Sequence, residues 1–314
     1  MFPRNTQNHE NLTIYFMLAP WRFCVRYTFS EQYLRTMDLE TKRIPFYKMH
    51  GGGNDFVLID HRRPLIPEAV QPRFARRACA RQVGVGADGL ILIETASQAD
   101  FRWRFYNADG SEAEMCGNGG RCAARLAVML GIAPPRLSFE TLAGIMKAEV
   151  QDRNVRLELT GIGDCRLYQE IPINGKTLTG HFLKVGVPHV VVPLKELEQV
   201  PVTFWGKIIR FHQMFQPAGT NVNFINFQGS QALEVRTYER GVEDETLACG
   251  TGAVAAALIA GRLGYAVSPV TVNTRGGETL TVHFKLQGED FKEVFLEGEA
   301  LVVCQGELWV DELK

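Results

Sequence analysis

The chain has 314 residues, enough for about two domains at roughly 150 residues each. Hydrophobic residues make up 46% and charged residues 22%, which provides the apolar side chains for packed cores and argues against a disordered chain. Basic and acidic residues number 34 and 35, so no overall positive charge favours a nucleic-acid backbone, and no apolar run reaches the roughly 20 residues that a membrane-spanning helix needs.

The N-terminal segment, residues 1–43, differs from the rest of the chain. It mixes aromatic residues with arginines, shows no clear period, and ends in a polar run over 38–43. We expect a dispensable extension, with a targeting or regulatory role as the alternative.

From residue 44 onward, strand-like and helix-like segments alternate, which predicts a mixed α/β chain. In the first half the pattern predicts helices over 73–82 and 123–130 and strands over 56–60, 90–93, 101–106, 147–150 and 155–159. In the second half it predicts a helix over 253–260 and strands over 190–192, 223–227, 232–238, 270–272 and 280–284. A stretch rich in glycine and proline, 161–172, is the expected domain boundary.

A repeated motif links the two halves. Cys116 and Cys249 each begin a Cys-Gly-x-Gly segment, preceded by an alternating strand with an acidic turn and followed by a helix of small residues. The first N–H groups of a helix have no intrahelical partner and form the positive end of its dipole. We therefore expect each cysteine to have a lowered pKa.

Two such helix starts facing each other would form a site with two thiols and two backbone nests for a carboxylate. That arrangement suits removal of a proton from one face of a carbon and its return to the other face, which is racemisation or epimerisation. Burial in the core is the simpler interpretation of a lone cysteine, but the repeat disfavours it for this pair. It is retained for the other cysteines, namely Cys24, Cys79, Cys122, Cys165 and Cys304. An odd cysteine count in a chain of this size also favours a reducing, cytoplasmic setting.

At these positions and elsewhere the sequence resembles the diaminopimelate epimerases. The matching segments are 48–56, 105–110, 115–121, 188–189, 238–241 and 245–253. The resemblance implies an α/β (α+β) fold with two pseudo-symmetric domains, each a curled mixed sheet around a central helix. We expect the first domain to comprise residues 44–160 with 302–314, and the second to comprise residues 161–301.

The same resemblance implies an isomerase that works without a pyridoxal cofactor. The seven histidines form no clear ligand pattern with the cysteines and no C-x-x-C pair occurs, so no metal site is expected. The small-molecule substrate of the enzyme would be 2,6-diaminoheptanedioate, interconverted between the LL and meso forms in lysine and cell-wall precursor biosynthesis. The family also implies a homodimer. Neither a nucleic acid nor a membrane is an expected partner.

By position, the resemblance assigns Cys116 and Cys249 as the acid–base pair. The implied substrate-binding groups lie in both halves: Asn54, Asn107, Gly117, Asn118, Asn221, Glu239, Arg240, Gly250 and Thr251. His189 and Glu239 would support catalysis. Two positions depart from the family pattern, since Gly89 stands where some members carry Gln and Val187 where many carry Asn.

Two alternatives of the same architecture stay open. A proline or hydroxyproline racemase would act on a one-headed substrate and would not need Asn221, Glu239 and Arg240. A non-epimerase isomerase relative need not keep both thiols. The run over 84–89 fits G-x-G-x-x-G but precedes a predicted strand instead of following one, so it does not predict a dinucleotide site.

Overall fold

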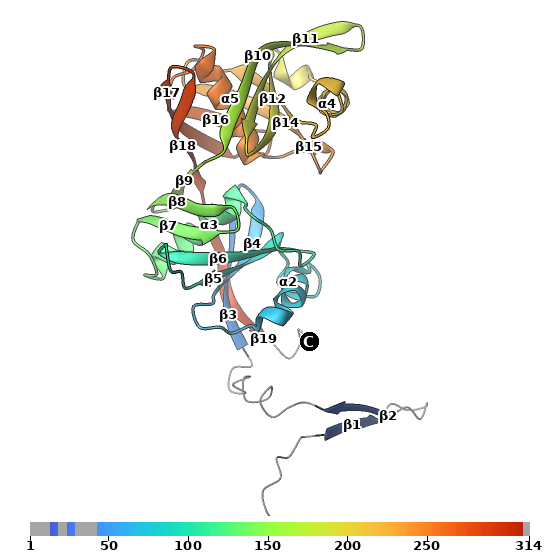
Figure 1. Ribbon diagram of the computed structural model, residues 1–314, viewed down its shortest axis with the longest axis vertical. Helices are drawn as coiled ribbons and strands as arrows, with labels where there is room; N and C mark the ends of the chain where they lie inside the picture. Colours follow the sequence, from blue (N-terminus) through green and yellow to red (C-terminus); the bar gives the residue numbers. More distant parts are fainter. Residues whose placement is uncertain (1–12, 18–23, 29–42, 310–314) are drawn as a thin grey trace, which may run out of the picture.

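The computed structural model describes residues 13–17, 24–28 and 43–309. Most of the predicted N-terminal extension lies outside them. Within it, strand β1 (Thr13–Met17) pairs antiparallel with β2 (Cys24–Thr28) in a separate two-stranded sheet (Figure 1).

The first half of the main body is a curled sheet around helix α3 (Gly117–Met129). Its strands are β3 (Arg43–Gly51), β4 (Asn54–Asp60), β5 (Gly89–Glu94), β6 (Phe101–Asn107), β7 (Arg136–Thr141), β8 (Gly144–Gln151) and β9 (Asn154–Glu158). The C-terminal strand β19 (Leu301–Trp309) pairs antiparallel with β3, and so it returns to this half. A 3-10 turn (Glu68–Val70) and helix α2 (Gln71–Cys79) pack on the other face of the sheet.

The second half repeats this plan around helix α5 (Gly250–Arg262). Its strands are β10 (Ile162–Ile173), β11 (Lys176–Val185), β12 (Val187–Pro193), β13 (Asn221–Phe227), β14 (Ala232–Glu239), β15 (Asp244–Thr246), β16 (Val270–Thr274), β17 (Thr279–Gln287) and β18 (Asp290–Glu299). Helix α4 (Val202–Arg210), between 3-10 turns at Leu197–Gln199 and Gln213–Phe215, covers the outer face. The small side chains of α5 let the sheet close tightly around it.

The two halves form one continuous ladder of strands. Strand β18 pairs antiparallel with β9, from Phe295 opposite Glu158 to Glu299 opposite Asn154, and β18 and β9 lie at the junction in Figure 1. An ion pair also crosses the junction, since Nη2 of the buried Arg121 on α3 lies 3.1 Å from Oε1 of the half-buried Glu278, between β16 and β17. The predicted mixed α/β class is confirmed, with strands predominating.

Some element boundaries differ from prediction. The stretch 161–172 forms most of β10, a strand interrupted by two register shifts and by positive φ at Asp164 and Tyr168, which explains its turn-like composition. Helix α3 begins six residues before the predicted start. Its first turn is glycine-rich because a Cβ at Gly119 would lie 3.1 Å from Ile91. No helix in the part of the chain that the structure describes is both long and apolar enough to cross a membrane.

Candidate active site

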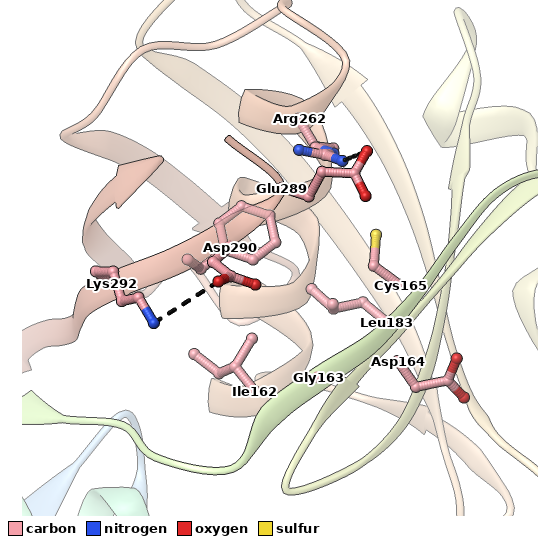
Figure 2. A pocket seen from close by; sticks show the side chains of 10 residues that line it. Ile162, Gly163, Asp164, Cys165, Leu183, Arg262, Glu289, Asp290 and Lys292 are labelled. Atoms are coloured by element: carbon pink, nitrogen blue, oxygen red, sulfur yellow. Dashed lines mark ion pairs between the residues drawn. The ribbon is translucent and has the colours of Figure 1, made fainter. Parts of the chain in front are cut away.

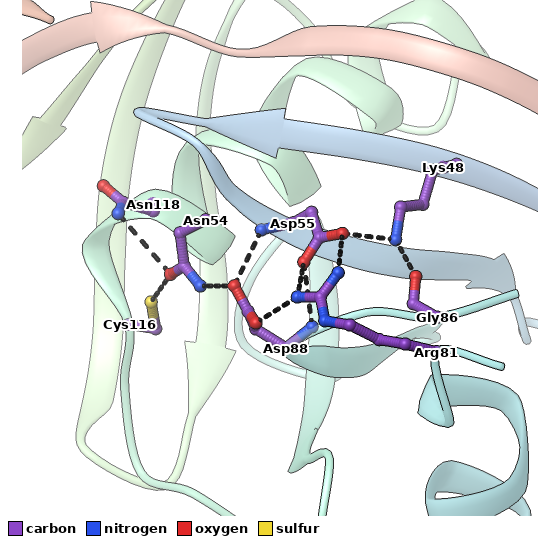
Figure 3. Close-up of polar contacts among 8 residues, drawn as sticks. All are labelled: Lys48, Asn54, Asp55, Arg81, Gly86, Asp88, Cys116 and Asn118. Carbon is purple, nitrogen blue, oxygen red and sulfur yellow. Dashed lines mark hydrogen bonds and ion pairs between the residues drawn. The ribbon is translucent and has the colours of Figure 1, made fainter. Parts of the chain in front are cut away.

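Cys116 is the N-cap residue of α3, with extended backbone geometry (φ −143°, ψ 121°). Its half-buried side chain directs Sγ to within 3.4 Å of Oδ1 of Asn54, which lies at the start of β4 (Figure 3). Nδ2 of Asn118, in the first helical turn, donates to the same oxygen at 3.5 Å. Backbone N–H groups of Asn118 and Gly119 also bond to the sulfur. Three predicted site residues are thus brought together in the first half.

A network of charged residues holds the other end of Asn54. Nδ2 of Asn54 donates to Oδ2 of Asp88 at 2.5 Å, and Arg81 bonds to both Asp88 (2.6 Å) and Asp55 (2.9 Å) (Figure 3). The ammonium of Lys48 lies 2.6 Å from the Asp55 carboxylate. Burial alone would raise the pKa of Asp55, but hydrogen bonds and charge from Arg81 and Lys48 lower it to about 2.

Cys249 occupies the equivalent position in the second half, as the N-cap of α5. It is 8% exposed, and its Sγ lies 3.7 Å from Oγ1 of Thr251. Burial, reinforced by the negative charge of Glu239, raises the pKa of the Cys249 thiol to about 12. Hydrogen bonds from Thr251 and from the N–H of Gly252 act in the opposite direction.

The expectation of lowered cysteine pKa values was therefore wrong. Burial also raises the pKa of Cys116, and it outweighs the two helix N–H groups that bond to its sulfur. The sequence reveals the helix start and its dipole. It does not reveal how completely the folded chain removes each sulfur from water, and desolvation penalises the thiolate more than a helix end stabilises it.

Asn221, Glu239 and Arg240 cluster at the ends of β13 and β14. Oδ1 of Asn221 accepts from the Arg240 backbone N–H at 2.8 Å, and its Nδ2 donates to the Pro188 carbonyl at 3.2 Å. Nη1 of Arg240 donates to the Ala218 carbonyl at 3.0 Å. Burial raises the pKa of Glu239, whose Oε2 accepts from the Thr246 hydroxyl at 3.0 Å.

His189 is completely buried in β12. Its Nδ1 lies 3.3 Å from Nδ2 of Asn223, a residue that also accepts from the Thr237 hydroxyl at 3.0 Å. Burial, together with the nearby charge of Arg240, lowers the pKa of His189 to about 3. The ring is therefore neutral at physiological pH, and the hydrogen bond from the Asn223 amide leaves the proton on Nε2.

The remaining predicted residues are more exposed or carry no side chain. Asn107 lies exposed at the end of β6, where its Nδ2 donates to the Ser111 hydroxyl at 3.0 Å. A Cβ at Gly117 would meet nothing within 4 Å, and one at Gly250 would approach only Leu296, at 3.2 Å. The start of α3 therefore leaves room for a ligand beside the backbone, whereas Leu296 crowds the start of α5 at Gly250.

Sequence reasoning missed two polar residues that touch the predicted ones. Asp88 binds Asn54, but it lies in the 84–89 run that was considered only as a nucleotide motif. Asn223 binds His189, and the Oδ1 of Asn223 is the closest atom to a Cβ built on Gly252. The available signal for Asn223 is its alternation with Asn221 in a largely apolar strand.

A concave region lies away from these residues, between β10 and β18 (Figure 2). Its charged groups pair with one another, with Arg262 2.8 Å from Glu289 and Lys292 3.8 Å from Asp290. Across the described ranges, no three His, Cys, Asp or Glu side chains gather in a way that could hold a metal ion.

Comparison with known proteins identifies the family. A family model described as diaminopimelate epimerase matches residues 46–166 and 181–303. The chain belongs to the diaminopimelate epimerase family. A family member from Aquifex aeolicus is 48% identical over 274 residues, spanning 84% of this chain and 97% of that protein. Another, from Archaeoglobus fulgidus, is 44% identical over 285 residues, spanning 87% and 99%.

Solved structures with low sequence identity share the fold of this diaminopimelate epimerase family member. A Bacillus anthracis phenazine biosynthesis protein of the PhzF family is 16% identical, with a TM-score of 0.62 over 85% of this chain and 99% of that one. A hydroxyproline epimerase from Agrobacterium vitis is also 16% identical, with a TM-score of 0.61 over 86% and 94%. The predicted fold class is thus confirmed by architecture as well as by sequence.

Proposed function

We propose that this chain interconverts LL- and meso-2,6-diaminoheptanedioate, with Cys116 and Cys249 as the acid–base pair. Family membership supports the reaction. The observation that carries the assignment of the pair is that each half places a free cysteine at the N-cap of its central helix. The curated relatives named above are diaminopimelate epimerases, and both thiols stand in the repeated motif.

The proposed reaction moves one proton at a time. One cysteine, as thiolate, removes the proton from the α-carbon, and the other, as thiol, delivers a proton to the opposite face. Within one turnover the first sulfur gains a proton and the second loses one, so the pair keeps the same total number of protons. The reverse reaction exchanges these roles. A carbon acid of this kind is very weak, and the negative charge that develops on its carboxylate needs stabilisation. The first-turn N–H groups beside Gly117 and Gly250 are the proposed source.

The distal amino-acid head of the substrate would bind to Asn221, Glu239 and Arg240. A guanidinium has five N–H donors, so Arg240 can hold a carboxylate while one donor bonds to Ala218. The Glu239 carboxylate can accept from an ammonium through the oxygen that Thr246 does not occupy. Their position beside Asn221 supports recognition of a two-headed substrate.

We also propose the domain limits inferred from the sequence, 44–160 with 302–314 and 161–301. The pairing of β19 with β3 supports the assignment of the last strand to the first domain. The family resemblance further supports a cytoplasmic homodimer that works without a cofactor.

Exchange of the α-proton in deuterated water tests the function. We expect deuterium incorporation and epimerisation with LL- and meso-diaminoheptanedioate and neither with proline or hydroxyproline. Cys116→Ala and Cys249→Ala should each abolish epimerisation, while Cys165→Ala, at an exposed cysteine, should retain it. Activity on proline would favour the alternative racemase, and substantial epimerisation by either single variant would contradict the two-base site.

A further inference from the structure

The side-chain amide of Asn54 can face Cys116 in two orientations. The orientation determines whether the amide favours the thiol or the thiolate form of the sulfur. An amide has an oxygen that only accepts and an NH2 group that only donates. With the oxygen toward Sγ, the amide accepts from the thiol S–H and favours the protonated sulfur. With the NH2 group toward Sγ, it would donate to the thiolate and favour the ionised sulfur.

The neighbours of Asn54 permit one of these orientations. The Asp88 carboxylate can only accept, and its Oδ2 lies 2.5 Å from the nitrogen of Asn54. The amide nitrogen of Asn118 can only donate, and it lies 3.5 Å from the Asn54 oxygen. Turning the amide over would place two acceptors against each other at Asp88 and two donors at Asn118. The hydrogen-bond network thus assigns the orientation of Asn54.

Asp88 is itself held in place from three directions. Its Oδ1 accepts from Arg81 at 2.6 Å, and its Oδ2 also accepts from the Asp55 backbone N–H at 3.1 Å. Its own N–H donates to the Asp55 carboxylate at 3.0 Å. Arg81 and Lys48 in turn pair with Asp55 (Figure 3). Asp88 is 42% exposed, so we ascribe its influence chiefly to this directional bonding and only in part to its charge.

We propose that Asp88 is a positioning residue for Cys116, which fixes the Asn54 amide so that its oxygen faces the sulfur. The sulfur then lies between backbone N–H donors of the helix start on one side and an acceptor on the other. Such balanced surroundings suit a group that must be thiol in one direction of the reaction and thiolate in the other. For turnover, the inference rests on the function proposed above, whereas its effect on the sulfur can be measured without turnover.

The test compares Asp88→Asn with a matched control, Asp60→Asn. Asp60 ends β4, the strand that Asn54 begins, but it bonds to Arg62 and does not contact Asn54. In Asp88→Asn the charge is lost and the new amide can present its own NH2 group, so Asn54 is free to turn. We expect the pKa of Cys116 to fall, which shifts the pH dependence of its alkylation by iodoacetamide to lower pH. Loss of the Asp88 charge, which raises the pKa of Cys116, accounts for part of that shift. The proposal therefore also requires a shift to lower pH in Asn54→Ala, which keeps the charge of Asp88 and removes the acceptor.

Alkylation is followed by mass spectrometry of the peptide that contains Cys116, in the full chain without substrate. Asp88→Asn should also lower kcat by about 10- to 100-fold with a smaller change in KM. Misalignment of an acid–base group slows proton transfer more than it weakens substrate binding. Asp60→Asn should match the wild type in both measurements. An unshifted alkylation curve in Asp88→Asn would overturn the proposal even if kcat fell, because the role of Asp88 would then be structural.

If Asp88→Asn does not fold, Asn54→Ala carries the test, since it removes the acceptor directly and keeps the charge of Asp88. The alkylation curve of Cys116 should again move to lower pH, and an unchanged curve would contradict the proposal. Failure of the two-base function would be separate from this result. It would appear as epimerisation by Cys116→Ala, whatever the titration of the sulfur in Asp88→Asn.

Discussion

The buried ring of His189 should make the stability of the protein depend on pH. Burial lowers its pKa from 6.5 to about 3 in the folded state. Between these pH values the unfolded chain therefore binds a proton at His189 that the folded chain does not bind. Stability from this group is fully present above pH 6.5 and is lost as the pH falls toward 3.

The size of the effect follows from the two pKa values. Each pH unit between them changes the unfolding free energy by about 1.4 kcal/mol for one proton. On acidification from pH 7 to pH 4.5, His189 alone should cost about 2–3 kcal/mol of stability. The ring is completely buried, so solvent screening does not reduce this value appreciably.

The assay is urea unfolding at both pH values, followed by circular dichroism at fixed protein concentration. His189→Gln removes the titrating ring, and the stability of this variant should fall about 2–3 kcal/mol less than that of the wild type on acidification. His212→Gln, at a half-buried histidine between α4 and β13, serves as the matched control. Equal pH dependence in the wild type and His189→Gln would refute the reasoning, since carboxylates elsewhere contribute equally to both.

Three further expectations concern the junction, the sheet and the second thiol. Arg121→Met should lower the unfolding free energy by about 2–3 kcal/mol because it leaves the half-buried Glu278 without its ion-pair partner, and adding Glu278→Leu should recover part of that loss in calorimetry. Gly89→Ala should cost about 1–3 kcal/mol because its Cβ would lie 2.5 Å from the Phe105 ring, whereas Gly163→Ala, with open space around it, should be neutral in thermal unfolding. Glu239→Gln should lower the pKa of Cys249 and speed its alkylation at alkaline pH, and an unchanged rate would exclude charge coupling between them.

Much of the fold could be predicted because the spacing of hydrophobic residues along the sequence indicates which side chains are buried. The alternation over 101–106 and 232–238 matches β6 and β14, and both central helices lie where small apolar residues predicted them. Strand β10 could not be predicted in the same way, because its bulges interrupt the alternation and imitate a linker. The pairing of β9 with β18 joins segments more than 130 residues apart, and no local pattern encodes it.

The candidate site was predictable to the extent that its residues lie in recognisable local motifs. The repeat identifies Cys116 and Cys249, and the structure places both at helix N-caps as expected. The partners that set their surroundings come from other elements. Asp88 reaches Asn54 across neighbouring strands, and Glu239 influences Cys249 from the end of β14. Such contacts depend on tertiary packing, which a single sequence does not display.

The raised pKa of Cys249 places a physical demand on the proposed reaction. With a pKa of about 12, forming its thiolate at pH 8 costs about 5 kcal/mol. A thiolate whose pKa is this high is also a stronger base than an ordinary thiolate. Its basicity offsets only part of the cost of forming it, because the rate of proton abstraction rises less steeply than the basicity of the group. Substrate binding must then supply the difference. An ammonium beside Glu239 would contribute by neutralising a charge that helps hold the sulfur protonated, while burial is the larger cause of the raised pKa. In this reaction, recognition of the substrate and activation of the thiol would be one event.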